Sequence, residues 1–303
     1  MDAVILWVDS SDPKYIQKKK ECIGSKIDKD ICNYRIGDRS TLKYCLRGLY
    51  FNAPWLRTIY IVTDNQWPKW LDEEKCKKLK PPILRVDHKT INPFKKSMYG
   101  SVSIEACLYN IPNLSKYFLY GNDDMFIVRP VEQSLFMNSN GIGIQQTGNI
   151  ITSDLETSDD PWVKWSNVYQ AKLASQMLNV NNFSFYTSTH HMNVYCKTAF
   201  HDIQKFYSKL FEDTQLLLGR QNCEQIGLLL MLYVSNIKGY CTKNTSVINS
   251  KYLNEHTNYE TELIDEDTVL LCTNNIYDPY SHKGYINFMD KLFPNKLSAE
   301  ITV

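Results

Sequence analysis

The sequence predicts an α/β protein with a mostly parallel sheet, covering helices and a smaller accessory lobe. Four short apolar runs, each ending in an acidic or amide turn, indicate buried strands at residues 3–8, 58–63, 83–86 and 117–120. Helical patterns separate these runs, and such alternation is typical of a parallel sheet with helices on its faces. The 303 residues, 43% of them hydrophobic, are enough for one large domain with an inserted lobe.

Helical periodicity is clearest at residues 41–51, where Leu42, Cys45, Leu46 and Leu49 share one face. Further helices are predicted at 70–79, 101–110, 161–178, 197–211, 220–234 and 284–292, with another strand at 268–272. Residues 131–185 are less regular and rich in Ser, Asn, Gln and Thr. We therefore expect an α/β half at 1–130, an accessory lobe at 131–185 and the remainder of the core at 186–303.

The composition argues against several classes of protein. Lys and Arg number 34 against 33 Asp and Glu, so charge gives no case for nucleic-acid binding. Nine cysteines without a CxxC pair indicate reduced thiols rather than a zinc ribbon or a disulfide framework. No signal peptide is visible, and no apolar run reaches the ~20 residues that cross a bilayer. We expect a cytoplasmic protein, with peripheral association at the inner face of the plasma membrane left open.

The acidic turn Asn122-Asp123-Asp124, after the fourth predicted strand, is the first candidate site. Ligands of open α/β sheets bind outside the carboxyl ends of the strands, where this turn should lie. Adjacent carboxylates suit a hard divalent cation, Mg²⁺ or Mn²⁺, which binds oxygen ligands and bridges a pyrophosphate. The structural alternative is a turn whose Asn and Asp side chains cap the next segment.

Three other positions carry side chains suited to acid–base or phosphate chemistry. Glu105 lies on a predicted helix that precedes the fourth strand. Partial burial there would raise its pKa and allow it to act as a base. The alternative is an ordinary surface position. His190, next to His191, suits acid–base or metal chemistry, or an ordinary loop. Arg220 starts a predicted helix, where phosphates bind, although a surface pair with Glu224 would explain it equally.

Taken together, these segments resemble the Stealth family, which includes bacterial capsular polysaccharide phosphotransferases and the lysosomal-enzyme N-acetylglucosamine-1-phosphotransferase. Residues 2–13 (DAVILWVDSSDP) resemble the first block of that family, and residues 35–124 resemble the second. His190 with Lys197 is similar to the third block, which departs from the family pattern at Met192 and Asn193. The last block of the family is similar to the pattern formed here by Arg220, Glu224 and residues 272–275.

The resemblance implies a Rossmann-like, GT-A-like core, a UDP-sugar donor, Mg²⁺ (or Mn²⁺) and an oligosaccharide or polysaccharide acceptor. It implies transfer of a hexose-1-phosphate, expected to be an N-acetylhexosamine-1-phosphate, with release of UMP during capsule or cell-surface polysaccharide synthesis. The implied catalytic residues are Glu105, Asp124, His190 and Arg220. Asp123 and Asp124 are the expected metal ligands. The expected substrate-binding residues are Trp7, Asp9, Asp12, Arg39, Asn122 and Glu224.

Two other functions stay open from the sequence. A GT-A-like glycosyltransferase would use the same donor and cation, but it would attack the anomeric carbon and release UDP. A catalytically silent sugar-binding or scaffold protein is the third hypothesis, and the presence of all four candidate polar residues argues against it. Either Glu105 or His190 is suited to take the proton of the acceptor hydroxyl.

Overall fold

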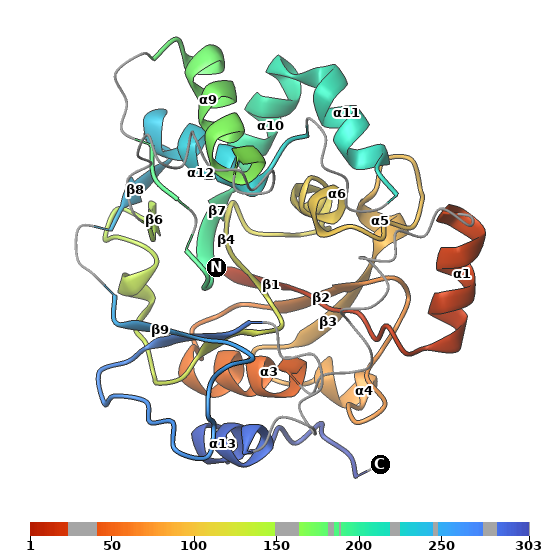
Figure 1. Ribbon diagram of the computed structural model, residues 1–303, viewed down its shortest axis with the longest axis vertical. Helices are drawn as coiled ribbons and strands as arrows, with labels where there is room; N and C mark the ends of the chain where they lie inside the picture. Colours follow the sequence, from red (N-terminus) through yellow and green to blue (C-terminus); the bar gives the residue numbers. More distant parts are fainter. Residues whose placement is uncertain are drawn as a thin grey trace.

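The structure, a computed structural model, describes residues 1–23, 41–148, 164–180, 185–187, 189–218, 225–244, 248–274 and 284–302. At its centre is a five-stranded sheet with the order β3-β2-β1-β4-β7 (Figure 1). Its strands are β1 (Asp2–Leu6), β2 (Ile59–Thr63), β3 (Ile83–Asp87), β4 (Tyr117–Asn122) and β7 (Asn193–Cys196). The first four run parallel, and β7 runs antiparallel to β4. The predicted α/β class with a mostly parallel sheet is therefore confirmed.

Helices cover both faces of this sheet, because alternate residues of β1 point into two hydrophobic cores. Ala3 and Ile5 belong to the core that contains α3 (Thr41–Asn52) and α13 (Tyr285–Leu292). Val4 and Leu6 belong to the opposite core. That core receives α6 (Ser101–Glu105), α9 (Gln170–Leu178), α10 (Lys197–Phe206), α11 (Ser208–Leu216) and α12 (Leu228–Ile237). Figure 1 shows α3 and α13 on one side of the sheet and α9 to α12 on the other.

Two smaller sheets extend the fold. A three-stranded sheet has the order β5-β10-β9, with β5 at Met125–Ile127, β10 at Leu270–Thr273 and β9 at Ser250–Leu253. A two-stranded sheet joins β6 (Gly143–Gln145) to β8 (Cys241–Lys243). Helix α3 approaches β5 so closely that a Cβ on Gly48 would lie 2.8 Å from the Ile127 carbonyl oxygen. The absence of a side chain at Gly48 therefore sets the distance between this helix and the small sheet.

The remaining elements are short, apart from α1 (Pro13–Ile23). Two of them are the α-helices α4 (Glu73–Cys76) and α5 (His88–Ile91). The others in the described ranges are short 3₁₀ or π turns at Leu108–Asn110, Gln133–Leu135 and Lys164–Tyr169. The pairing of β6 with β8 and the packing of α9 on α12 join residues of 131–185 to the second half of the chain. The boundaries at 130 and 185 stay a prediction.

Several predicted helices differ from those observed. The predicted helix 70–79 is reduced to α4, and 101–110 divides into α6 and the Leu108–Asn110 turn. One continuous helix over 197–211 is wrong: the chain breaks at Tyr207, whose hydroxyl donates to the Leu173 carbonyl of α9 at 2.8 Å. The tertiary contact of Tyr207 outweighs the local helical preference at that point.

The predicted start of the helix 220–234 is also wrong. Helix α12 begins at Leu228, and residues 225–227 are not helical. Gly227 has an extended backbone and its N–H donates to the buried side chain of Gln170, which holds it out of a helical turn. Arg220 and Glu224 lie outside the described residues.

The cysteines of the described part are free thiols, and six of these seven are buried. Burial raises the pKa of the Cys76 and Cys107 thiols to about 12 in each case, which keeps them protonated and unreactive at neutral pH. Within the same part of the chain, every helix is too short or too polar to reach across a lipid bilayer.

Arg47 joins α3 to the C-terminal segment. Its side chain is 3% exposed and donates to the two carboxylate oxygens of Glu300 at 2.7 and 2.6 Å. It also donates to the Phe293 carbonyl at 2.8 Å. Burial acts to lower the pKa of Arg47, but the hydrogen bonds and charge of Glu300 raise it above its usual value. The ion pair therefore stays charged and holds the helix that leads into the candidate site.

Replacing Arg47 with Met should lower the free energy of unfolding by roughly 3–5 kcal/mol, because Glu300 is then left nearly buried without its charged partner. Urea unfolding measures the change. Arg85→Met is the matched control: its contact with Glu73 is a partly exposed ion pair, worth about 1 kcal/mol or less. Equal losses of unfolding free energy in the two variants would show that the buried ion pair stabilises the fold no more than the partly exposed one.

Candidate active site

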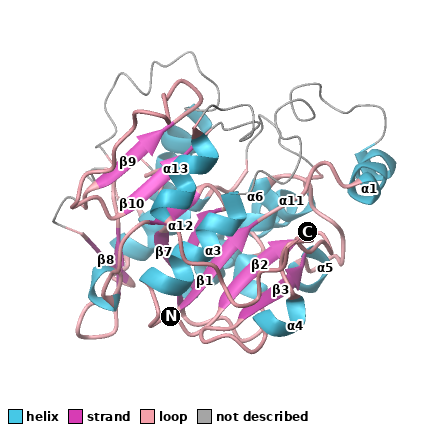
Figure 2. Ribbon diagram, turned by 90° about the horizontal axis from the view of Figure 1, so that it is seen from below, coloured by secondary structure: helices cyan, strands magenta, loops and turns pink. Residues whose placement is uncertain are grey.

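The candidate site lies where the chain order of the central sheet changes direction. Strands β2 and β3 lie on one side of β1, and β4 lies on the other. Figure 2 shows β1, β2 and β3 side by side. The register pairs Leu6 with Asn122, so β1 and β4 end at the same level and the segments after them begin next to each other. Such a switch point, at the carboxyl ends of parallel strands, is where open α/β sheets bind ligands.

The turn after β4 carries Asp123 and Asp124 at this switch point. Thr41, the first residue of α3, donates from Oγ1 to Asp123 Oδ2 at 2.6 Å. The Asp124 carbonyl accepts a hydrogen bond from the Thr273 N–H at 3.0 Å, which joins the turn to the end of β10. Burial, and then the charges of Asp123 and Asp124, raise the pKa of the Cys45 thiol well above its usual value. The two carboxylates thus concentrate negative charge next to a buried region.

A divalent cation fits this turn. Asp123 and Asp124 would supply oxygen ligands, and a cation would neutralise their negative charge. Burial is the main cause of the raised pKa of Cys45 and of Cys272, and the charges of Asp123 and Asp124 add to it. Mg²⁺ is commonly bound through one or two carboxylates, with phosphate oxygens and water completing its shell. Among the residues that the structure describes, no group of three His, Cys, Asp or Glu side chains is arranged around one metal position.

The turn after β1 contains Asp9 and Asp12. Asp9 Oδ1 accepts from the Ser11 N–H at 2.9 Å and the Ser11 hydroxyl at 2.6 Å. Gln66, which follows β2, donates to the Asp9 carbonyl at 2.9 Å and to Asp12 Oδ2 at 3.2 Å. Burial acts to raise the pKa of Asp12, but hydrogen bonds from Gln66 and the Lys14 N–H hold it below its usual value. Gln66 therefore braces this turn against the neighbouring strand.

Trp7, the other predicted substrate contact from this segment, is 5% exposed and packs in the hydrophobic core with α3. The main-chain N–H of Trp7 donates to the Val62 carbonyl at 3.1 Å. Little of its ring is left for a substrate, so its observed contacts position the turn that follows β1.

Glu105 lies at the end of α6, on the opposite face of β4 from α3, and is half-buried. Its Oε1 accepts a hydrogen bond from the Tyr120 hydroxyl at 2.8 Å. The same hydroxyl lies 3.2 Å from Asn122 Oδ1. Burial, followed by the charges of Glu105 and Asp124, raises the pKa of Tyr120 well above its usual value. Tyr120 thereby links Glu105 to the acidic turn, and the surface alternative for Glu105 is wrong.

His190 reaches the site through the segment before β7. Met192, two residues along, is 1% exposed and packs on β4 at Gly121. A Cβ on Gly121 would lie 2.8 Å from Met192 Cγ, so a larger residue there would push this segment away. The departure from the family pattern at Met192 thus has a packing role. Desolvation lowers the pKa of His190, so its imidazole is neutral at pH 7.

The ring of His190 contacts Tyr252 of β9, with 5.1 Å between ring centroids. The Tyr252 hydroxyl accepts a hydrogen bond from Asn274 Nδ2 at 2.6 Å. Asn274 directly follows Thr273, whose N–H bonds the Asp124 carbonyl. His190 is therefore linked to the acidic turn by a series of contacts through β9 and the end of β10.

Asp9, Asp12, Asn122, Asp123 and Asp124 lie at or after the ends of the neighbouring strands β1 and β4. Glu105 is joined to Asn122 through Tyr120, and His190 contacts Tyr252. Arg39, Arg220 and Glu224 lie outside the described residues. The sequence reasoning missed Thr41, Gln66, Tyr120 and Tyr252. Thr41 could have been noticed as a polar residue at a helix start, whereas Tyr252 carried no local signal because its contacts come from distant segments.

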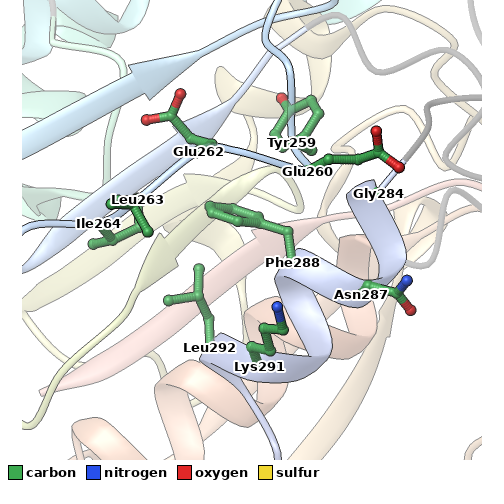
Figure 3. A pocket seen from close by; sticks show the side chains of 10 residues that line it. All are labelled: Tyr259, Glu260, Glu262, Leu263, Ile264, Gly284, Asn287, Phe288, Lys291 and Leu292. Carbon is green, nitrogen blue, oxygen red and sulfur yellow. The ribbon is translucent and has the colours of Figure 1, made fainter.

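Two pockets of the described structure lie elsewhere. One of about 420 Å³ is formed between the segment after β9 and α13 (Figure 3). Phe288 and Leu292 of α13 point toward Leu263 and Ile264 across it. The other, of about 600 Å³, lies between the segments around Val131 and Ile248. None of the predicted site residues lines either pocket, so the candidate site is a separate feature at the sheet edge.

Comparison with known proteins identifies part of the chain. Residues 35–145 match the family described as Stealth protein CR2, conserved region 2. An exopolysaccharide phosphotransferase of Streptomyces coelicolor is 39% identical over 144 residues, which are 46% of this chain and 26% of that protein. An exopolysaccharide phosphotransferase of Lactiplantibacillus plantarum is 37% identical over 143 residues, 47% of this chain and 40% of that protein. The chain thus matches less than half the length of these relatives.

Solved structures also match, at low identity. A galactosyltransferase, LgtC, solved with donor and acceptor sugar analogues, is 12% identical with a TM-score of 0.47, over 100% of this chain and 97% of that one. The bifunctional glycosyltransferase WbbM is 10% identical with a TM-score of 0.48, over 98% of this chain and 50% of that one. The region that matches the Stealth family model, residues 35–145, includes Glu105 and the Asp123-Asp124 turn. The resemblance to the Stealth family is therefore confirmed over residues 35–145, which match conserved region 2 of that family.

Proposed function

We propose that this protein transfers a hexose-1-phosphate, with an N-acetylhexosamine as the expected sugar, from a UDP-sugar to a saccharide hydroxyl in capsule or cell-surface polysaccharide synthesis. The observation that carries the proposal is the acidic turn Asp123-Asp124 at the switch point between β1 and β4. Conserved region 2 includes this turn. Relatives that are 36–39% identical are named exopolysaccharide or capsular polysaccharide phosphotransferases, which supports phosphoryl over glycosyl transfer.

In the proposed reaction, the acceptor oxygen forms a bond to the β-phosphorus of the donor. The bond from that phosphorus to the oxygen bridging the two phosphates breaks, and UMP leaves with that oxygen. Such chemistry depends on positioning and on neutralising charge. Mg²⁺ or Mn²⁺ bound by Asp123 and Asp124 would supply part of that neutralisation. We also assign Arg220 to a phosphate oxygen, and Arg39, Glu224 and the Asp9–Asp12 turn to the donor.

We assign His190 as the base that takes the acceptor proton. Its lowered pKa keeps the imidazole neutral at pH 7, and its side chain is exposed at the sheet edge. Glu105 already accepts the hydrogen bond of the Tyr120 hydroxyl, so we assign it to positioning Tyr120 and Asn122. The hydrogen bond of Glu105 to Tyr120 supports this choice between Glu105 and His190, which the sequence left open.

A donor labelled with ³²P at the β-phosphorus tests the reaction type. UDP-glucose, UDP-galactose and their N-acetylated forms are incubated with Mg²⁺ and saccharide acceptors, and both products are separated. Phosphotransfer should place the label in the saccharide and release UMP, because the sugar C1–O bond stays intact. A label found only in UDP would refute the proposal and establish the GT-A-like glycosyltransferase alternative.

A further inference from the structure

Tyr252 is an exposed aromatic side chain at the edge of the candidate site. It is 46% exposed, whereas most large apolar side chains of the described structure are buried. Its hydroxyl is fixed by the Asn274 amide at 2.6 Å, and its ring lies against His190 at 5.1 Å between centroids. The other exposed large apolar residues of the described part are Ile16, Phe51, Phe206, Leu263 and Ile301. Ile16 meets the predicted site residue Asp12 through its main chain, at the start of α1. Tyr252 differs because its exposed ring itself lies against a predicted catalytic residue, His190.

The register of the small sheet sets the distance of Tyr252 from the acidic turn. Cys272 of β10 pairs with Met125 on one side and with Tyr252 on the other. Met125 directly follows Asp124. Two strand spacings place the Tyr252 backbone about 10 Å from Met125. The backbone of Tyr252 is thus two strands away from the residue that follows Asp124.

The partners of Tyr252 indicate what its exposed ring would bind. A pyranose has an apolar face of C–H groups and a rim of hydroxyls. An aromatic ring flanked by an amide and an imidazole complements both features. A general base must lie about 2.6–3.2 Å from the hydroxyl that it deprotonates. A sugar that rests on Tyr252 therefore presents its rim to His190, which is the place of the acceptor rather than of the donor.

We propose that Tyr252 is the platform on which a pyranose of the saccharide acceptor stacks, with one of its hydroxyls directed at His190. This inference rests on the proposed function, because it names the acceptor subsite of that reaction. Asn274 holds the phenol, and through Thr273 it joins the platform to the acidic turn.

Saturation-transfer NMR tests the platform with the methyl pyranosides of glucose, galactose, mannose and N-acetylglucosamine as probes. At least one glycoside should bind the wild-type protein through its C–H face. Tyr252→Ala should weaken that binding about tenfold, the scale of losing an aromatic contact. Tyr252→Phe and Tyr252→Trp should retain most of it, because they keep an aromatic ring. Phe206→Ala removes another exposed ring, on α10, and should bind as the wild type does.

Three results would overturn the platform: no binding of any glycoside by wild-type protein, wild-type binding by Tyr252→Ala, or displacement of the glycoside by excess UDP-sugar. The last would place Tyr252 in the donor site. Release of UMP from UDP-sugars by wild-type protein is measured separately. If UMP is released but binding ignores Tyr252, the platform alone fails. If glycosides bind at Tyr252 but no UMP is ever released, Tyr252 belongs to a sugar-binding site without a transfer reaction. Both the acceptor platform and the proposed function then fail.

Discussion

Asp124→Asn should lower kcat/KM for the UDP-sugar by at least ~100-fold, the low end for losing a group that stabilises developing charge on phosphate. The carboxylate stands at the switch point between β1 and β4, where the pyrophosphate is proposed to bind. The asparagine keeps the shape of the side chain and the main-chain bond to Thr273, so the loss should come without a change in melting temperature. UMP release and thermal unfolding, measured on the same preparation, separate the two effects.

With Asp124 as the principal ligand, Asp123→Asn should lose less activity than Asp124→Asn. Asparagine at position 123 keeps a side-chain oxygen that can accept the Thr41 hydroxyl, so the turn keeps this contact. Asp87→Asn is the matched control. Asp87 ends β3 and caps α5 by accepting the Lys89 N–H at 2.8 Å, and asparagine caps a helix equally well. EDTA should abolish activity, and Mg²⁺ or Mn²⁺ should restore it. Full turnover in chelator, or equal mild losses in all three variants, would remove the metal from the mechanism.

His190→Gln should lower kcat by at least ~100-fold, the scale of losing a general base. The base must be unprotonated to accept the acceptor proton. Desolvation lowers the pKa of His190 below the usual 6.5, so wild-type activity should persist at pH 6.5 and fall only as the pH drops through this lower value. A pH profile of kcat/KM shows this acid limb, and His190→Gln should lack it.

His191→Gln is the matched control for the pH profile. Burial also lowers the pKa of His191, but its ring nitrogen lies 3.3 Å from the Met192 carbonyl rather than beside Tyr252. This variant should keep the acid limb. Glu105→Gln should keep it as well, since Glu105 is assigned to positioning Tyr120. An acid limb that survives in His190→Gln and vanishes in Glu105→Gln would transfer the role of base to Glu105.

The local features of the site were within reach of the sequence. Strands β1, β2, β3 and β4 were predicted because each is a continuous apolar run that ends in polar turn residues, and both signals are local. The position of Asp123 and Asp124 at the end of β4 follows directly from that pattern. The helix α3 was predicted nearly to the residue, since its apolar residues recur with a helical period and face the core.

Only the tertiary structure decided which of these local elements meet. The apolar pattern of β1 would be the same whether β4 or β3 lay beside it, so the switch point is invisible in the sequence. The contacts of Thr41 with Asp123, of Tyr120 with Glu105, and of Tyr252 with His190 each join different elements. Local periodicity reports whether a side chain is buried. It does not report which partner buries it, because that partner is selected by packing over the whole chain.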